Sequence, residues 1–472
     1  MSSASSESSS TAALDQFHWE PQPKGQALVN ELVADFLARC PEAERLKNRM
    51  KAESGTRFVD WVDYITVPKT TANILTRLAD AGFVRTPHEG ASECYVNDKG
   101  IFPAIIVCNS QTTRVAIKVA SVADFLFAQR VAASGQIQGG PGSQLRMVKA
   151  FEGTNAELWA CERHGTRGFE AKDSDPSKVI AAMRHLEALR SRKRDFATSS
   201  EGFAEIHRIL DAAIREIGRD WTCDLFFESE RNYWQSKNHA AQFQYGRQQA
   251  LGLGWANHDH HTYRSSREAY KDLISVLEKL GFHCRERFYA GAEAGWGAQV
   301  LEQPVTGITI FADVDMSAEE LLGDFAHTGL AARAQLGTIG LWCALHGEAM
   351  LEAGMHHLEC QFDWHALRDQ MQEADIRTMD PFTTFPYLRQ AFTQGEHWKV
   401  SESRLAALVA RKQITPQQAE DFRNHGALGS HLENLERNDG FKGFNQQGVS
   451  HIISKTDPRK QVGARETVGS GH

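Results

Sequence analysis

The spacing of hydrophobic residues predicts helices and strands that alternate along the chain. In residues 25–40, Leu28, Leu32 and Phe36 recur at helical intervals and share one face of a predicted helix. Residues 58–67 have the pattern of a short strand, and residues 68–84 that of a helix that starts after a proline and stops at a glycine. This alternation indicates a protein that mixes helices and strands.

The same succession of elements returns twice later in the sequence. A strand pattern followed by an amphipathic helix recurs at 258–283 and at 355–376. Further strand patterns follow the first two such units, at 102–110, 114–120, 296–304 and 305–315. The recurring unit is a strand, a helix and two or three antiparallel strands, which indicates duplication of a small βαβββ module. We expect an α+β fold in which repeated βαβββ modules form a curved mixed sheet with flanking helices.

The chain divides into two candidate domains of similar size. We place their boundary near residue 222, after a long predicted helix, so that the domains cover residues 15–222 and 223–460. Residues 1–14 are rich in serine and lack the basic and apolar regions of a signal peptide, so we expect a disordered tail. Residues 461–472 are expected to form a second flexible tail.

Composition narrows the classes of function. The 60 acidic and 52 basic residues give a net charge of −8 and are well mixed, so we expect neither a nucleic acid nor a membrane as partner. The eight cysteines never form C-x-x-C, the usage of a reducing compartment, and no apolar run approaches the roughly 20 residues that span a bilayer. We therefore expect a cytoplasmic protein, and the sequence leaves its oligomeric state open.

Coordinating side chains gather in the stretch "NHDHHTYRSS" at residues 257–266. Strand alternation places one polar set on one face and a second set on the other: His258, His260, Thr262 and Arg264 against Asp259, His261 and Tyr263. In the third unit, alternation places His357 and Glu359 on one face and His356 with apolar residues on the other. Near the C-terminus, a glycine-rich segment supplies Glu433 and Glu436.

Two histidines and one carboxylate on separate strands form a facial triad that suits Fe(II) or Mn(II), and zinc accepts the same ligands. The chain has 20 histidines, and most histidines in proteins are satisfied surface or core residues. The spacing alone therefore leaves a metal site and an ordinary structural role both open.

Three segments of the C-terminal half resemble motifs of one family. "HDHHTYR" is similar to its N-D-H-I-A-F-R strand, and "HHLECQF" to its N-H-V-T-I-S strand. "HLENLERNDGFKGFNQQGVSHIISKT" is similar to its Y-I-E-F-A-E-R segment and the R-D-G-F-E and I-F-E-S-T stretches after it. Through these segments, the region of residues 225–460 resembles the plant-type branch of the 2-oxoadipate dioxygenase/decarboxylase family, whose members are also called hydroxyglutarate synthases. This family has the vicinal oxygen chelate fold.

The resemblance implies a role for each matched residue. It assigns the metal ligands to His260, His357 and Glu433, with Glu436 as the other candidate carboxylate. Arg264 becomes the catalytic candidate, a guanidinium that clamps a substrate carboxylate. Weaker candidates would support the ligands or contact the far end of the substrate: His258, His261 and Glu436 for the first role, Lys442 and Asn445 for the second.

The implied activity is that of an Fe(II)-dependent dioxygenase/decarboxylase, with Mn(II) and Zn(II) as other possible metals. Its partners would be O2 and a 2-oxo acid resembling 2-oxoadipate, which it would convert to a 2-hydroxy acid and CO2. Two departures from the motifs, His356 in place of asparagine and the ending at residues 452–456, leave the exact substrate open. The N-terminal half is interpreted as a degenerate relative that has Asp63 and Tyr64 in place of Asp259 and His260.

Two other functions stay open. One is a different metal-dependent enzyme on the same fold, such as an isomerase, a hydrolase or a ring-cleaving dioxygenase. The other is a binding protein without catalytic activity. Fold alone distinguishes none of these functions, because function depends on the residues of the site.

Overall fold

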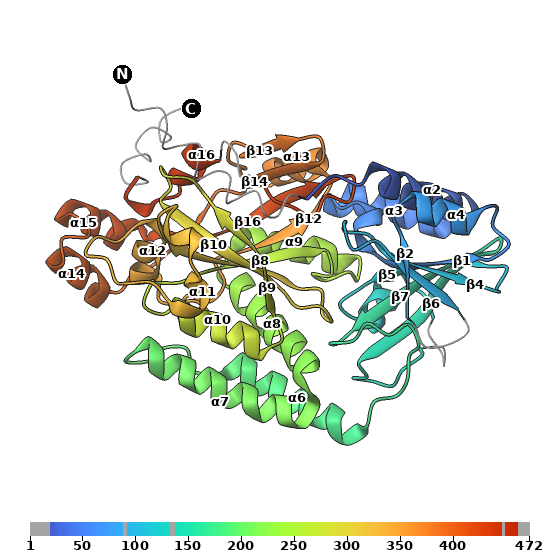
Figure 1. Ribbon diagram of the computed structural model, residues 1–472, viewed down its shortest axis with the longest axis horizontal. Helices are drawn as coiled ribbons and strands as arrows, with labels where there is room; N and C mark the ends of the chain where they lie inside the picture. Colours follow the sequence, from blue (N-terminus) through green and yellow to red (C-terminus); the bar gives the residue numbers. More distant parts are fainter. Residues whose placement is uncertain (1–18, 88–91, 133–136, 446–448, 461–472) are drawn as a thin grey trace.

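The computed structural model of the chain describes residues 19–87, 92–132, 137–445 and 449–460. The two tails expected at residues 1–14 and 461–472 lie outside this part. The described strands form two mixed sheets, one of seven strands from the N-terminal half and one of nine from the C-terminal half. The two sheets lie next to each other, with most helices on the outside (Figure 1).

The C-terminal sheet contains two modules that are joined at its centre. The first runs in chain order through β8 (His258–Arg264), α10 (Tyr270–Lys279), β9 (His283–Tyr289), β10 (Trp296–Glu302) and β11 (Thr309–Asp315). Within this module β11 lies parallel to β8, and β10 and β9 continue the sheet in antiparallel order. The module is therefore a complete βαβββ unit.

The second module repeats this arrangement with an insertion. It comprises β12 (His357–Gln361), α13 (Trp364–Glu373), β13 (Thr383–Phe385), β14 (Leu388–Phe392) and β16 (Ala427–Arg437). Between β14 and β16 the chain forms β15 (Glu396–Trp398), α14 (Glu402–Ala410) and α15 (Pro416–His425). β16 lies parallel to β12, and β12 pairs antiparallel with β8, so the two first strands meet in the middle of the sheet.

The N-terminal sheet has the same plan. One module is β1 (Val62–Pro68), α4 (Ile74–Asp80), β2 (Val84–Thr86), β3 (Glu93–Val96) and β4 (Ala104–Cys108). The other is β5 (Thr113–Lys118), α5 (Val122–Ala128), β6 (Leu145–Gly153) and β7 (Ala156–Arg163), one strand shorter. Their first strands, β1 and β5, again pair antiparallel at the centre. The prediction of repeated βαβββ modules in a curved mixed sheet is confirmed.

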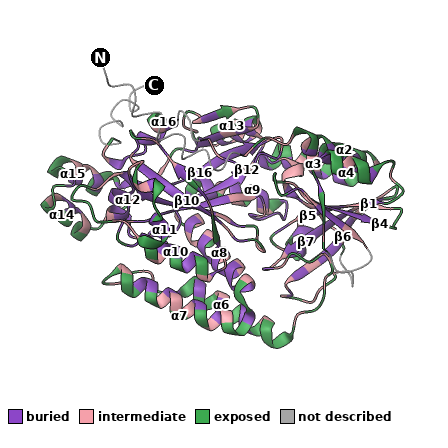
Figure 2. Cartoon of the chain, viewed as in Figure 1, coloured by how far each residue is buried: buried purple, intermediate pink, exposed green. Residues whose placement is uncertain are grey.

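Helices cover the sheets and connect them. The remaining helices are α2 (Pro23–Arg39), α3 (Pro41–Ser54), α6 (Pro176–Ser191), α7 (Ser199–Ile217), α8 (Arg219–Gln235), α9 (His239–Ala250), α11 (Phe325–Thr328), α12 (Thr338–His346) and α16 (Ser450–Ser454), with short 3-10 turns at Phe58–Trp61, Glu320–Leu322 and Pro458–Lys460. The strands are largely buried, whereas helices at the periphery such as α14 and α15 have exposed outer faces (Figure 2). None of the described helices combines the length and the apolar character needed to cross a membrane.

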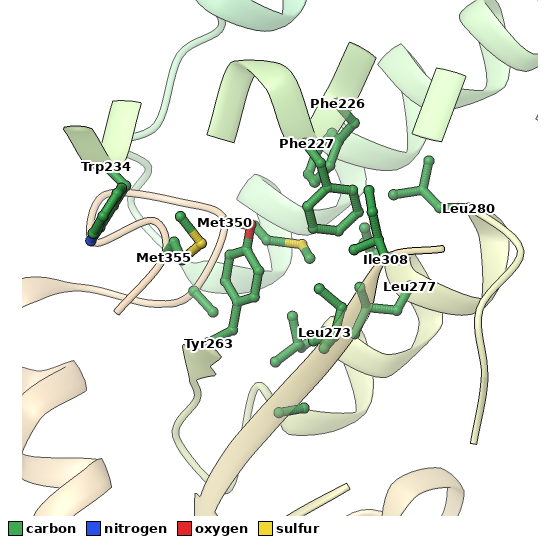
Figure 3. Close-up of a cluster of buried hydrophobic side chains, with 14 of the residues drawn as sticks. Phe226, Phe227, Trp234, Tyr263, Leu273, Leu277, Leu280, Ile308, Met350 and Met355 are labelled. Atoms are coloured by element: carbon green, nitrogen blue, oxygen red, sulfur yellow. The ribbon is translucent and has the colours of Figure 1, made fainter. Parts of the chain in front are cut away.

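The largest core cluster lies between the C-terminal sheet and helices α6, α7, α8 and α10. Phe226 and Phe227 from α8 pack with Tyr263 from β8 and with Leu273 and Leu277 from α10 (Figure 3). The domain boundary expected near residue 222 falls inside α8, and helices on both sides of it contribute to this cluster. This core fixes β8 from behind, so that the other face of β8 is free to form a site.

Candidate metal centre

Strand pairing places the polar residues of three strands in two neighbouring rows. His260 on β8 lies opposite Glu359 on β12, which in turn lies opposite Glu433 on β16. Two residues along, His357 lies between Thr262 and His431. Side chains two residues apart in a strand point to the same face, so the two rows share one face of the sheet.

The side chains of these rows converge on one point. Glu359 Oε1 lies 3.1 Å from His260 Nε2 and also contacts His357 Nε2. Glu433 Oε2 lies 3.7 Å from His357 Nε2. All four side chains are buried, and one ligand atom of each of His260, Glu359 and Glu433 lies within 4.8 Å of the others. We call these four residues, His260, His357, Glu359 and Glu433, the ligand ring.

Hydrogen bonds orient the carboxylates of the ring. Thr262 Oγ1 donates to Glu359 Oε1 at 2.8 Å, and Gln390 Nε2 donates to Glu433 Oε1 at 2.9 Å. The other oxygen of Glu359 is buried and has no hydrogen-bond partner among the described residues. Buried carboxylate oxygens normally have a partner, so this oxygen marks a place in the ring where a ligand or an ion could bind.

His260 is oriented by a chain of charged groups. Its Nδ1 lies 2.8 Å from Asp259, which accepts two hydrogen bonds from Arg437 at 2.7 and 2.9 Å. Burial alone raises the pKa of Asp259, but Arg437 and His260 hold this pKa below its usual value. A histidine that donates one ring N–H to a carboxylate presents its other nitrogen as a lone pair, an arrangement typical of metal ligands. Here the nitrogen with the lone pair is Nε2, which faces the other residues of the ligand ring.

The protonation of the ring suits a cation. Burial lowers the pKa values of His260 and His357, which therefore remain neutral imidazoles, the form that coordinates metals. Burial raises the pKa of Glu433 to about 8, and burial together with the charge of Glu433 raises the pKa of Glu359 well above its usual value. A divalent cation would compensate both carboxylates, so the donor set fits Fe(II), Mn(II) or Zn(II).

A cavity of about 60 Å³ adjoins the ring, several times the roughly 10–15 Å³ that one water molecule requires. Two residues that the sequence predicted for the substrate, Arg264 and Asn445, line it together with His260, His357 and Glu433. Aromatic side chains form much of its wall, namely Phe288, Trp296, Phe311, Phe382, Phe392 and Phe444.

Arg264 is the cationic residue of this cavity. Its guanidinium is buried, and Nε and Nη1 have no hydrogen-bond partner among the described residues. Asp313 lies opposite Arg264 on β11, and burial raises the pKa of Asp313 to about 8. Burial thus opposes a charge on Asp313, and the unpartnered nitrogens of Arg264 are available to an anionic ligand.

Two interpretations of β8 and β12 need correction. His258 does not share a face with His260, because a bulge at Asp259 shifts the pairing with β12 and turns the His258 ring toward His261, 5.1 Å away. His356 does not point away from His357, because it precedes β12 and escapes the strand alternation. Its ring lies 4.6 Å from that of His357.

The remaining predicted residues lie away from the cavity. His261 packs against Phe227 of the core, and Glu436 accepts a hydrogen bond from the backbone N–H of Trp364. Lys442 forms an ion pair with Glu302 at 3.2 Å. The structure therefore groups His260, His357, Glu433, Arg264 and Asn445 and leaves these three outside the cavity lining.

Sequence reasoning did not propose Glu359, Asp259, Gln390 or Arg437 as site residues. For Glu359 a signal was present, because it shares the strand face of His357 two residues earlier. Asp259 was hidden by the bulge, and Arg437 reaches it across 178 residues of sequence. Such long-range contacts have no local signature.

In the N-terminal sheet the corresponding residues have other partners. Asp63 pairs with Arg163 at 2.8 Å, and Tyr64 is buried in a small hydrophobic cluster. The groups of three possible metal ligands found among the described residues all lie in the C-terminal half.

Comparisons with known proteins add little beyond the fold. No family model and no curated protein matches the chain. Solved structures that match include methylmalonyl-CoA epimerase from Mycobacterium tuberculosis, with 12% identity, a TM-score of 0.22 and coverage of 39% of this chain and 89% of that one. A mutant of 4-hydroxymandelate synthase from Streptomyces coelicolor matches with 11% identity, a TM-score of 0.24 and coverage of 86% and 97%.

Likenesses this weak carry no argument about function. The fold is identified by the order of the strands, in which two βαβββ modules meet through their first strands. This is the vicinal oxygen chelate fold. In the vicinal oxygen chelate sheet of the C-terminal half, the ligand ring lies on the first strands of both modules and on the last strand of the second.

Proposed function

We propose that the protein is a non-haem Fe(II) enzyme that uses O2 to decarboxylate and hydroxylate a small 2-oxo acid. The observation that carries this proposal is the position of Arg264, a buried guanidinium with unpartnered nitrogens in the cavity of the ligand ring. A site for a divalent cation next to a site for an anion suits a substrate that is both a metal chelator and an acid. The resemblance to the 2-oxoadipate dioxygenase/decarboxylase family supports the same reaction.

The reaction balances without another reactant. One 2-oxo acid and one O2 give one CO2 and one 2-hydroxy acid that is one carbon shorter. Fe(II), held by His260, His357 and Glu433, would supply open coordination positions for the 2-oxo acid and O2. Mn(II) and Zn(II) suit the same donors, but zinc has no redox chemistry to offer this reaction.

The residues of the chain position the reactants. Asp259 and Arg437 hold His260 with Nε2 toward the cavity, and Gln390 holds Glu433. Arg264 lies four residues from His260 on the same strand, roughly 13 Å along its backbone at about 3.3 Å per residue. Both side chains reach into one cavity, so a substrate with an acid group at each end can contact both. The aromatic wall limits the access of water.

The role of Glu359 determines how many coordination positions of the metal stay open. Three protein ligands would leave the ion enough open positions for a 2-oxo acid and O2, and a fourth would take one of these positions. We therefore assign Glu359 to positioning through its hydrogen bond with Thr262 and not to permanent coordination.

One observation favours a second candidate function. Glu359 is a carboxyl of raised pKa beside the ring, and such a group suits proton transfer at a carbon next to a carbonyl. A metal-dependent isomerase on this fold would use it as general acid and base, and it would not consume O2.

The test is a measurement of O2 consumption and CO2 release by the Fe(II)-loaded protein with 2-oxoadipate, with product analysis by mass spectrometry. We expect equal amounts of O2 consumed and CO2 released, and a 2-hydroxy acid that contains oxygen from O2. Turnover of a 2-oxo acid without O2 uptake would contradict the proposal and favour the isomerase.

A further inference from the structure

A second cluster of possible ligands lies beside the ligand ring. One nitrogen from each of His356, His357 and His431 lies within 4.8 Å of the other two. The ring centroids are 4.6 Å apart for two of the pairs and 4.9 Å for the third. We call these three residues the histidine cluster.

Each ring of the cluster has a nitrogen without a partner. Nε2 of His356, Nδ1 of His357 and Nε2 of His431 are buried and make no hydrogen bond with the described residues. Nδ1 of His356 lies 3.0 Å from the carbonyl oxygen of Gly429, so that it donates and leaves the lone pair on Nε2. Buried polar atoms normally have partners, and three such nitrogens together indicate a missing one.

The fold holds the cluster rigidly. His357 and His431 lie opposite each other on β12 and β16, and their rings stack at an interplanar angle of 26°. Trp342 of α12 packs edge-on against His356, and Phe392 of β14 packs against His431. Because an imidazole lone pair lies in the plane of its ring, the stacked pair would have to tilt apart for His357 and His431 to reach one ion together with His356.

We propose that the histidine cluster is a second metal site, which binds a late first-row transition-metal ion through imidazole nitrogens alone. Zinc and copper suit such a ligand set, whereas magnesium and calcium require oxygen ligands. His357 would belong to both sites, with Nε2 toward the ligand ring and Nδ1 toward the histidine cluster. The inference does not depend on the reaction proposed above.

The charges around the cluster restrict the ion further. Arg264 is the charged group that acts on all three imidazoles, and its positive charge opposes a cation. The carboxylates of the ring, Glu359 and Glu433, lie on the far side of His357 and attract one. Because no carboxylate belongs to the cluster itself, singly charged Cu(I) carries a smaller burial cost than Zn(II).

Metal stoichiometry tests the inference. The full-length protein is equilibrated with Zn(II), or with Cu(I) under anaerobic conditions, and bound metal is counted by mass spectrometry. We expect two ions per chain with at least one of these metals. Either His356→Asn, which keeps a hydrogen-bonding side chain beside Gly429, or His431→Phe, which keeps the stacked ring, should reduce this to one.

The matched control is the other site. Glu433→Gln should also reduce two ions to one, and X-ray absorption of the ion that remains should show a shell of imidazole nitrogens only. His357→Ala should lose both ions. Circular dichroism verifies that each variant is folded. If one of the two cluster variants does not fold, the other one carries the test.

The outcomes separate the two sites. Suppose that the wild type binds one ion with either metal, and that His431→Phe and His356→Asn still bind it. This result would overturn the second site and leave the ligand ring intact. Two ions in both of these variants would also overturn it. Loss of one ion in the cluster variants, with loss of the other in Glu433→Gln, would support it.

Discussion

At the scale of single residues, the site depends on how burial is compensated. Four titratable side chains share a small buried volume, and each has a specific partner or a buried atom without one among the described residues. Thr262, Gln390 and Asp259 fix three of them by hydrogen bonds of 2.8–2.9 Å. The two carboxyls of raised pKa, Glu359 and Glu433, are the groups that a cation would stabilise most.

The assignment of roles to these two carboxyls predicts opposite phenotypes. Glu433→Gln should lose most bound Fe(II), because it replaces an anionic ligand with a neutral amide. Glu359→Gln should keep about one iron per chain and lose turnover. Iron analysis after dialysis checks both, with His258→Ala, whose ring faces His261, as the control. Full iron occupancy in Glu433→Gln would contradict the ligand assignment.

The chain that orients His260 gives a second prediction. Asp259→Asn should weaken Fe(II) binding by roughly 10- to 100-fold, the usual effect of removing a carboxylate behind a metal-bound histidine. Asp211→Asn, the same change in an exposed pair with Lys279, should leave the affinity within a few-fold of the wild type. Competition with a fluorescent chelator measures both affinities, and equal affinities would argue against a role for Asp259.

Arg264 gives a prediction about substrate and not about metal. Arg264→Lys should raise the KM for 2-oxoadipate roughly 10- to 100-fold, because a charge-assisted hydrogen bond contributes about 1.5–3 kcal/mol. The Kd for Fe(II) should stay unchanged. A loss of iron in this variant would show that Arg264 supports the ring and does not clamp the acid.

At the scale of elements, the sequence predicted what local patterns determine. Apolar periodicity identified α2 and α10, and strand alternation put His260 on one face with Arg264 and put His357 on one face with Glu359. The helix expected over residues 68–84 is shorter, Ile74–Asp80, because Asn73 has a φ of 53° and interrupts it. The bulge at Asp259 and the position of His356 depend on pairing between strands, which no local pattern reports.

The helices behind β8 contain a buried ion cluster with a defined pH dependence. Glu230 is fully buried and pairs with Arg192 and Arg194. Burial alone raises its pKa, but the two arginines hold this pKa below its usual value. The carboxylate therefore stabilises the fold above the pKa of the unfolded chain, and this contribution is lost as pH falls through the lowered folded value.

Replacement of Glu230 tests this contribution. Glu230→Gln should reduce the free energy of unfolding near pH 7 by about 3–5 kcal/mol, because it leaves the buried guanidinium of Arg192 and the half-buried one of Arg194 without their carboxylate. The difference from the wild type should shrink at acidic pH. Urea unfolding at several pH values measures it, with Glu205→Gln, in an exposed pair with Arg208, as the control. A difference that does not change with pH would contradict the assignment.

At the scale of the whole molecule, the N-terminal half supports the site of the other half. Arg57 donates hydrogen bonds of 2.8 Å to the carbonyl oxygen of Arg437 and to the side chain of Asn438. Arg437 in turn binds Asp259, the partner of His260. The N-terminal half is thus linked to His260 of the ligand ring by three successive contacts: Arg57 with Arg437, Arg437 with Asp259, and Asp259 with His260. Its own first strand holds Asp63 and Tyr64 in place of site residues.

This connection predicts an effect at a distance. Arg57→Ala should weaken Fe(II) binding, on the order of 10-fold, since it loosens the segment that carries Arg437. Arg45→Ala, in an exposed pair with Glu42, should have no effect. Equal Fe(II) affinities in the two variants would mean that the N-terminal half does not influence the ring.

The central claim is that His260, His357 and Glu433 hold an iron to which a 2-oxo acid binds. It is tested most directly by anaerobic titration of the metal-free protein with Fe(II), followed by 2-oxoadipate in the same cuvette, beside His260→Ala. We predict that the wild type binds iron at the ligand ring and develops a visible charge-transfer band when the acid is added. His260→Ala should show neither. Equal, weak iron binding by both proteins and no band would contradict the account.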